Sequence, residues 1–154
     1  MSTVTVGQAI PSFSAESTQG TISSADLLGH AYVLYFYPRD NTPGCTTQAQ
    51  NFRDLSQAFH DAGLKIIGVS RDTMSSHERF ATKQELPFAL ISDPEEKLCE
   101  LFGVMKLKNM YGKQVRGIER STFLINAKGE LAQEWRGLRV PGHVDQVLAA
   151  ARAL

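Results

Sequence analysis

The sequence has few cysteines, no excess of either charge and no long apolar run. Its 154 residues include two cysteines, Cys45 and Cys99, too few for a disulfide scaffold and too widely separated for the paired ligands of a zinc site. Sixteen Lys and Arg balance sixteen Asp and Glu, so bulk charge does not attract nucleic acid or anionic membranes. The longest apolar run, residues 31–37, is about a third of a membrane span. We therefore expect a cytoplasmic protein with no membrane or nucleic-acid partner.

Motifs that mark other classes of protein are also missing. The first residues, MSTVTVGQAIPSF, lack the basic and apolar regions of a secretion signal. No internal repeat, linker, P-loop, GxGxxG or GxSxG string occurs, so we expect residues 1–154 to form a single domain. The histidines stand singly, which argues against a metal site and against a cysteine–histidine hydrolase. They are His30, His60, His77 and His143.

Hydrophobic periodicity predicts strands that alternate with helices. Apolar runs predict buried strands at 31–37, 64–69 and 88–91, and a hairpin that joins 121–125 to 130–135. Apolar residues at helical spacing predict a helix at 45–62. A capping Ser75 or Ser76 and the terminating Pro87 predict another at 75–85, and a last helix is expected at 142–154. The first thirty residues are expected to be irregular, apart from a hairpin about Gln19-Gly20 and a helical turn at 25–28. This order predicts an α/β protein with a thioredoxin-like fold, a central mixed β-sheet flanked by helices.

One helix has a particularly clear start signal. The tetrapeptide Asp93-Pro94-Glu95-Glu96 combines a capping residue, a proline at the first helical position and an acid at the third. We therefore predict a helix that begins directly after Asp93 and ends at Phe102, before Gly103.

The segment most informative about function is PRDNTPGC, residues 38–45, which follows the predicted central strand. It places Cys45 in the first turn of a helix, where unpaired backbone N–H groups and aligned peptide dipoles favour a thiolate. Pro43 biases Thr42 toward an extended conformation, and Gly44 lets the backbone approach a small substrate closely. The alternative is a buried, inert cysteine, the commoner state of a lone thiol in a cytoplasmic protein.

The pattern Pro-x-x-x-Thr-x-x-Cys, preceded by YFY, closely resembles the active-site motif of the peroxiredoxins. The resemblance extends over nearly the whole chain: GQAIPSF (with an inserted Ile10), YVLYFYPRDNTPGCT and NMYGKQVRGIERSTFLIN are similar to stretches of the bacterioferritin comigratory protein (PrxQ) subfamily. It implies an antioxidant thiol peroxidase on a thioredoxin fold, which reduces hydrogen peroxide, and organic hydroperoxides as a further class, without metal, haem, flavin or other cofactor.

The resemblance also implies the site residues. The reactive cysteine falls on Cys45, whose thiolate attacks the terminal peroxide oxygen and becomes a sulfenic acid. Thr42 would orient nucleophile and substrate, and Arg120, taken from GIERSTFLI, would hold the thiolate and stabilise charge on the leaving oxygen. Backbone N–H groups of Gly44 and Cys45 would bind the same oxygens, and Pro38 would shield the sulfur from water.

Each of these residues also has a structural interpretation. Thr42 before Pro43 is typical of a turn, and Pro38 can simply end a strand. Arg120 beside Glu119 can form a surface ion pair, and its position alone does not single it out.

The cysteine that would complete the reaction cycle is missing from the positions where the subfamily carries it. Those positions match Gln50 and Ala81 here, so we assign no resolving cysteine. Cys99, flanked by Leu98 and Leu101, is interpreted as a small core residue, although local unfolding that forms a Cys45–Cys99 disulfide stays an alternative. The resemblance then implies a monomer with one essential cysteine, reduced by thioredoxin, glutaredoxin or a low-molecular-weight thiol.

Other functions are less well supported by the sequence. A basic stretch has one interleaved aromatic, Tyr111, and is interpreted as a solvated loop near an anion-tolerant site; it comprises Lys106, Lys108, Lys113, Arg116 and Arg120. A thioredoxin-like disulfide reductase would need a second thiol in Cys-x-x-Cys, which Cys45 lacks. A binding or chaperone-like module on the same fold would not need Cys45 at all.

Overall fold

The computed structural model describes residues 4–154, which form a seven-stranded sheet, a separate two-stranded hairpin and six helices. The elements on the N-terminal side are β1 (Ser14–Ser17), β2 (Gly20–Ser23), α1 (Ser24–Leu27), β3 (Ala31–Phe36), α2 (Pro43–Asp54), α3 (Ser56–Asp61), β4 (Leu64–Ser70) and α4 (Met74–Lys83). They are followed by β5 (Ala89–Ser92), α5 (Lys97–Leu101), β6 (Met105–Met110), β7 (Lys113–Ile118), β8 (Ser121–Ile125), β9 (Leu131–Arg136) and α6 (His143–Arg152).

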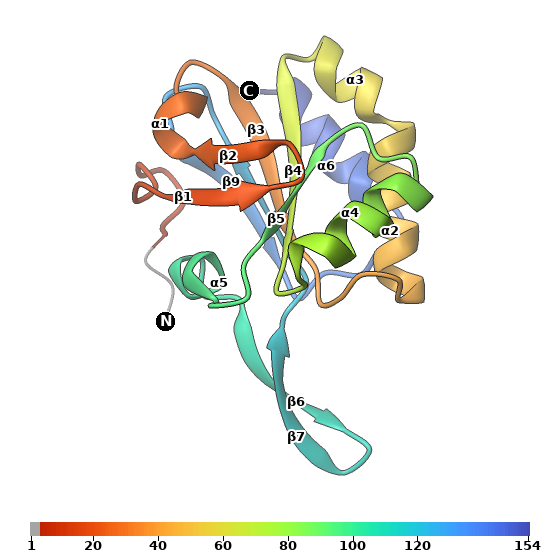
Figure 1. Ribbon diagram of the computed structural model, residues 1–154. Helices are drawn as coiled ribbons and strands as arrows, with labels where there is room; N and C mark the ends of the chain where they lie inside the picture. Colours follow the sequence, from red (N-terminus) through yellow and green to blue (C-terminus); the bar gives the residue numbers. More distant parts are fainter. Residues whose placement is uncertain (1–3) are drawn as a thin grey trace.

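The large sheet has the strand order β2-β1-β5-β4-β3-β8-β9. β3, β4 and β5 are parallel, whereas β8, β9, β1 and β2 pair in antiparallel fashion. Helices α2, α3, α4 and α6 cover one face of this sheet, and α1 and α5 lie on the other (Figure 1). This arrangement confirms the predicted mixed sheet flanked by helices. Within the described residues, no helix is long and apolar enough to cross a membrane.

β3 divides the hydrophobic core into two clusters because its side chains alternate between the two faces of the sheet. Val33 and Tyr35 contribute to the cluster under α2, α3, α4 and α6. Leu34 and Phe36 contribute to the cluster on the side of α1 and α5. Residues 32–37 are all buried, so the prediction of a central strand covered on both faces is confirmed.

The predicted helix 45–62 is two helices in the structure. The backbone leaves the helical conformation at Leu55 (φ −103°, ψ 8°), which ends α2 and precedes α3. The change of direction keeps Phe59 of α3 packed against Phe52 of α2, with ring centroids 5.9 Å apart. Apolar spacing did not reveal this break, because side chains on both segments contribute to the same core. Gly63 ends the segment as expected, with φ +86°.

The start of α5 differs from the prediction. Pro94 and Glu95 form a turn closed by the Glu96 N–H, which donates to the Asp93 carbonyl at 3.0 Å, and the helix begins only at Lys97. The Asp93 carboxylate still caps this helix, because it accepts hydrogen bonds from the backbone N–H groups of Leu98 (3.2 Å) and Cys99 (2.8 Å). The predicted N-cap was therefore wrong, since Glu96 occupies that position, although the Asp93 side chain does accept hydrogen bonds from the first turn of the helix.

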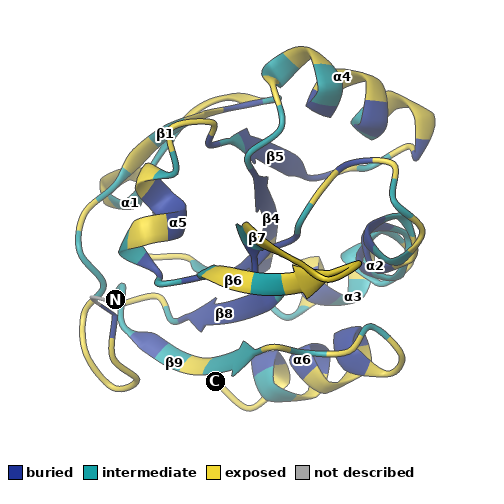
Figure 2. Cartoon of the chain, turned by 90° about the horizontal axis from the view of Figure 1, so that it is seen from below, coloured by how far each residue is buried: buried dark blue, intermediate teal, exposed yellow. Residues whose placement is uncertain are grey.

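The basic stretch predicted as a loop is mostly the hairpin β6–β7, which extends away from the large sheet (Figure 1). Its turn is Tyr111-Gly112, and both residues have positive φ, as a tight two-residue turn requires. Most hairpin side chains are exposed, including Leu107 and Val115 on the two strands (Figure 2). With neither face buried, the hairpin has no alternating apolar pattern, which is why the sequence did not predict it.

Gly68 provides a test of packing beneath the helical layer. It lies on β4 between Tyr35 of β3 and Leu90 of β5, and a Cβ at this position would come within 2.8 Å of Leu90 Cδ2 and 3.0 Å of Tyr35 Cζ. We expect Gly68→Ala to lower the free energy of unfolding by about 1–3 kcal/mol, because overpacking displaces neighbours in a dense core. Urea denaturation measures the change.

Gly117→Ala is the matched control. A Cβ at Gly117 meets its nearest neighbours at 3.9 Å, an ordinary contact distance, so this variant should be as stable as the wild type or slightly more stable. Equal stability of the two variants would contradict the overpacking argument.

Candidate active site

Cys45 lies in the first turn of α2, directly behind the loop that follows β3. Thr42 is the N-cap in an extended conformation (φ −91°, ψ 151°), and Pro43 occupies the first helical position. The helical ladder starts with the Thr46 N–H, which donates to the Thr42 carbonyl at 2.9 Å. The N–H groups of Gly44 and Cys45 precede that ladder, so the positive end of the helix is next to the Cys45 side chain.

Arg120 is in direct contact with the thiol. Its Nη2 donates to Cys45 Sγ at 3.3 Å, and its Nη1 donates to Gln48 Oε1 at 2.7 Å. A Cβ added to Gly44 would lie 3.2 Å from Arg120 Nη2, so the small residue at position 44 leaves room for the guanidinium. The structure therefore brings together three residues predicted for the site: Gly44, Cys45 and Arg120.

Gln48 is a site residue that the sequence analysis missed. Its side chain is fully buried, and its Nε2 has no hydrogen-bond partner within residues 4–154. It follows Cys45 by three positions on the same helix, so the two side chains share one helical face. That spacing is the signal that could have identified it once Cys45 was singled out.

The other two predicted residues, Thr42 and Pro38, do not contact the sulfur through a hydrogen bond that the structure shows. The Thr42 hydroxyl donates to the Arg39 carbonyl at 2.8 Å, so it stabilises the loop in this conformation. Pro38 is half-buried directly after β3, and the preceding Tyr37 N–H donates to the Val69 carbonyl at 3.0 Å.

Cys45, whose exposed fraction is 2%, belongs to a core cluster that is rich in aromatic side chains. Tyr35 stacks on Phe52 with a centroid distance of 4.5 Å, and its hydroxyl lacks a hydrogen-bond partner in the described part of the chain. Burial, with the nearby charges of Cys45 and Asp40, raises the pKa of Tyr35 far above its ordinary value. Because Cys45 is buried, water screens the interaction between Arg120 and the sulfur less than it would at the surface.

Cys99 is separated from Cys45 by the sheet. It is fully buried in the core cluster on the side of α1 and α5, whereas Cys45 belongs to the opposite cluster, and both thiols are free. Burial and the neighbouring Asp93 carboxylate raise the pKa of Cys99, which disfavours its reactive thiolate. The structure supports the interpretation of Cys99 as a core residue and does not bring the two cysteines together.

The two positions at which the sequence lacks a second cysteine lie on facing helices. Gln50 is on α2, and its Nε2 donates to Oε1 of Gln84, the C-cap residue of α4, at 2.9 Å. Ala81 lies on α4 and packs against the core cluster that contains Cys45. Both positions therefore belong to the helical layer that carries Cys45.

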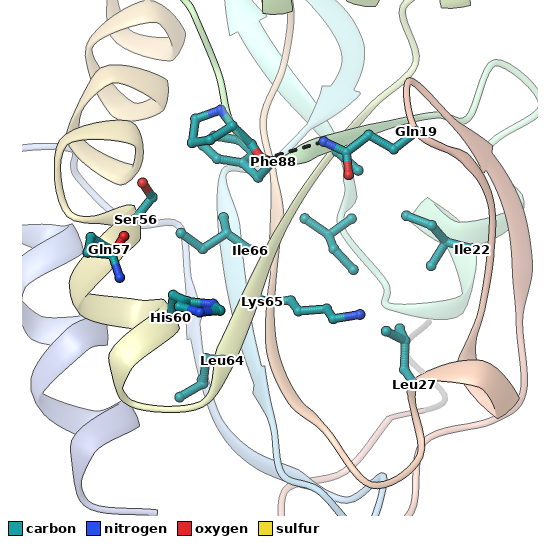
Figure 3. Close-up of a pocket in the computed structure, with 13 residues that line it drawn as sticks. Gln19, Ile22, Leu27, Ser56, Gln57, His60, Leu64, Lys65, Ile66 and Phe88 are labelled. Carbon is teal, nitrogen blue, oxygen red and sulfur yellow. Dashed lines mark hydrogen bonds between the residues drawn. The ribbon is translucent and has the colours of Figure 1, made fainter.

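A cavity of about 590 Å³ lies elsewhere, between β2, α3 and β4 (Figure 3). His60, Lys65 and Phe88 are among its lining residues, whereas Cys45 and Arg120 are not. The cavity and the Cys45–Arg120 contact thus lie at different places. The contact is the better candidate for the active site, because nucleophilic catalysis needs a thiol beside a fixed cation.

Comparison with known proteins agrees with this site. The AhpC/TSA family model matches residues 6–134. Peroxiredoxin Bcp of Xanthomonas campestris is 56% identical over 125 residues, covering 81% of this chain and 78% of that protein. Peroxiredoxin Bcp of Bacillus subtilis is 47% identical over 147 residues, covering 95% of this chain and 94% of that protein.

Solved structures show the same likeness. Peroxiredoxin Q of X. campestris superimposes with a TM-score of 0.87 at 50% identity, over 92% of this chain and 90% of that one. The C-to-S mutant of Xylella fastidiosa PrxQ has a TM-score of 0.92 at 37% identity, over 97% and 96% of the two chains. The chain belongs to the AhpC/TSA family. It is a peroxiredoxin with a thioredoxin-type fold, and its activity is that of a thiol-dependent peroxidase.

His143, near Arg120, predicts a pH dependence of stability. It begins α6, is buried, and its Nε2 lies 2.8 Å from Thr122 Oγ1. Burial, together with the charge of Arg120, lowers the pKa of His143 from 6.5 to about 4. Between these values the unfolded chain binds a proton that the folded chain resists, so stability falls as pH drops through this window and is regained above it.

We expect the wild type to lose about 1–2 kcal/mol from this residue between pH 7 and pH 5, after allowance for solvent screening. The His143→Asn variant should lack that part of the slope, and denaturant titrations at both pH values measure it. The remaining titrating groups are common to both proteins, so equal slopes would show that His143 does not stay neutral in the fold.

Proposed function

We propose that Cys45 is the peroxidatic cysteine and that its substrates are hydrogen peroxide and organic hydroperoxides. The thiolate attacks the terminal peroxide oxygen, an S–O bond forms as the O–O bond breaks, and water or an alcohol leaves after protonation. Cys45 is oxidised to a sulfenic acid while the peroxide is reduced. The observation that carries this proposal is the 3.3 Å contact between Arg120 Nη2 and Cys45 Sγ at the start of α2.

Arg120 has two roles in the proposed step. Its permanent charge lies beside the attacking sulfur, and the same guanidinium can stabilise negative charge that develops on the leaving oxygen. The N–H groups of Gly44 and Cys45 at the helix start add donors for the peroxide oxygens. Thr42 would exchange its hydrogen bond to Arg39 for one to the peroxide, and Pro38 would limit access of water to the sulfur.

Organic hydroperoxides are included because of a relative. Trapped intermediate/ligand complex structures of the X. campestris bacterioferritin comigratory protein concern the alkyl peroxide reduction activity of that protein. One of them matches this chain with a TM-score of 0.87 and 49% identity.

The sulfenic acid is proposed to be reduced by an external thiol. Cys99 is on the opposite side of the sheet from Cys45, which supports a one-cysteine cycle. In two further X. campestris structures a cysteine is replaced by serine, a different one in each. Those two cysteines are as many positions apart as Cys45 and Ala81 are here, and position 81 of this chain is not a cysteine. An incoming thiol would form a mixed disulfide and release water, and a second thiol would then regenerate Cys45. Thioredoxin, glutaredoxin or a low-molecular-weight thiol supplies both of these reducing thiols.

We further propose that residues 1–154 act as one domain in the cytoplasm. The two core clusters share the strands of one sheet, which supports a single folding unit, and two free cysteines suit a reducing compartment. A monomeric state rests on the subfamily resemblance alone.

The role of Arg120 is tested by Arg120→Gln, which removes the charge next to the sulfur. We expect the second-order rate constant with hydrogen peroxide to fall by on the order of 10²–10³-fold, since one donor to a developing oxyanion contributes that much. Stopped-flow measurement on reduced protein gives the constant. Arg152→Gln, at the exposed end of α6, is the charge-matched control and should react at the wild-type rate. A similar rate in both variants would contradict the proposal.

Intact mass spectrometry tests the one-cysteine cycle. Reduced protein treated with one equivalent of hydrogen peroxide should gain one oxygen, which a sulfenic-acid reagent traps at Cys45. The Cys45→Ser variant should show no such product, and Cys99→Ser should turn over with an external thiol like the wild type. A loss of two hydrogens in place of the oxygen would instead demonstrate a Cys45–Cys99 disulfide and overturn the external-thiol proposal.

A further inference from the structure

A buried polar cluster anchors the loop between β3 and α2. Its centre is the Asp40 carboxylate, 6% exposed, which accepts hydrogen bonds from Tyr37 Oη (2.7 Å) and Ser76 Oγ (2.8 Å) and lies 2.8 Å from His77 Nδ1. The Asp40 backbone N–H donates to Asp72 Oδ2 at 3.0 Å. Asp40 thus holds the loop through both its side chain and its backbone, five residues before Cys45.

The two ring nitrogens of His77 each have a buried partner. Its Nε2 lies 2.9 Å from the Ile91 carbonyl, which can only accept, and its Nδ1 faces Asp40 Oδ2. Burial would raise the pKa of Asp40, but hydrogen bonds from His77, Tyr37 and Ser76 and the charge of His77 outweigh it and lower that pKa. Asp40 is therefore an acceptor-only carboxylate. Both ring nitrogens of His77 therefore face acceptor atoms, and Nδ1 and the Asp40 carboxylate form a buried pair.

The contacts within this cluster argue against a second interpretation, in which it binds a metal cation. Ligand atoms of Asp40, Asp72 and His77 all lie within 4.8 Å of one another. Each group is already engaged, however: Asp72 Oδ2 accepts from Ser70 Oγ and from the Asp40 backbone, and His77 Nδ1 already pairs with Asp40 Oδ2. A metal ion would have to displace these donors.

We propose that His77 is a positioning residue for the peroxidase reaction: its ion pair with Asp40 fixes the loop that presents Cys45 to peroxide and to Arg120. The next residue, Asn41, has a φ of +60°, a conformation that non-glycine residues adopt at a cost. The contacts of Asp40 with Tyr37, Ser76 and His77, directly before Asn41, keep the strained loop in one conformation. Because α2 begins at Pro43, three residues after Asp40, any shift at Asp40 moves the first turn that carries Cys45.

Asp40→Asn tests this proposal, which rests on the proposed role of Cys45. The variant keeps the shape of Asp40 but removes the charge that holds His77 as an imidazolium. We expect kcat/KM for hydrogen peroxide to fall by about 10- to 100-fold, because a displacement of about 1 Å at a reacting group can cost roughly 10²-fold. Ser76→Ala removes a neutral hydrogen bond from the same carboxylate and is the matched control, with an expected loss of about threefold or less.

Alkylation with iodoacetamide distinguishes three effects of the variant: displacement of Cys45, global unfolding, and a change in the intrinsic reactivity of the sulfur. In Asp40→Asn, Cys45 should be modified faster than in the wild type, because the loosened loop exposes it, whereas Cys99 in the opposite core cluster should stay protected. This comparison needs no peroxide, so it distinguishes failure of this proposal from failure of the proposed role of Cys45. Slower alkylation of Cys45 in proportion to the peroxide reaction, or modification of both cysteines together, would overturn the positioning role.

Nitrogen NMR of the wild type provides a measurement that does not depend on a variant folding. At pH 7 both ring nitrogens of His77 should give signals of protonated nitrogen; comparison with His77→Gln assigns these signals. In Asp40→Asn one of the two nitrogens should lose its proton. A single protonated nitrogen in the wild type would show that the pair is neutral and would overturn the proposal.

Discussion

The site depends on one contact, the hydrogen bond between the Arg120 guanidinium and the Cys45 thiol, which joins residues 75 positions apart in the sequence. Sheet topology makes this contact possible. β8 pairs antiparallel with β3 so that Ser121 lies opposite Phe36, which places the start of β8 beside the end of β3. Arg120 directly precedes β8, and the loop to α2 directly follows β3, so the cation and the thiol meet at the same edge of the sheet.

The same topology keeps the second thiol away from this chemistry. Alternate side chains of β3 face opposite layers, and the layer with α5 contains Cys99 whereas the layer with α2 contains Cys45. A disulfide between them would require Cα atoms within about 7 Å, so one layer would have to leave the sheet. Because that rearrangement would expose a fully buried aromatic cluster around Phe102 and Phe123, an external thiol is the less costly reductant.

The sequence predicted those features that depend on local order. Continuous apolar runs identified the central strands, and the position of Cys45 after a strand and before an amphipathic segment identified the helix start. Features that depend on contacts across the sheet were not accessible in this way. Arg120 was identified only through the family resemblance, since the β3–β8 register that brings it to Cys45 cannot be inferred from the residues next to it in the sequence. The pairing of His77 with Asp40 spans 37 positions, and a lone histidine carries no sign of a partner.

The loop from β3 to α2 therefore lies between two cations of different kinds. On one side, Arg120 is bonded to the neutral amide of Gln48, which leaves its charge available to the sulfur. On the other side, His77 is bonded to the carboxylate of Asp40, so its charge is neutralised within the cluster. A carboxylate at position 48 would compete with the thiolate for the guanidinium, and an unpaired His77 would add a second cation behind the loop. This division lets one cation act on the sulfur while the other holds the backbone that carries it.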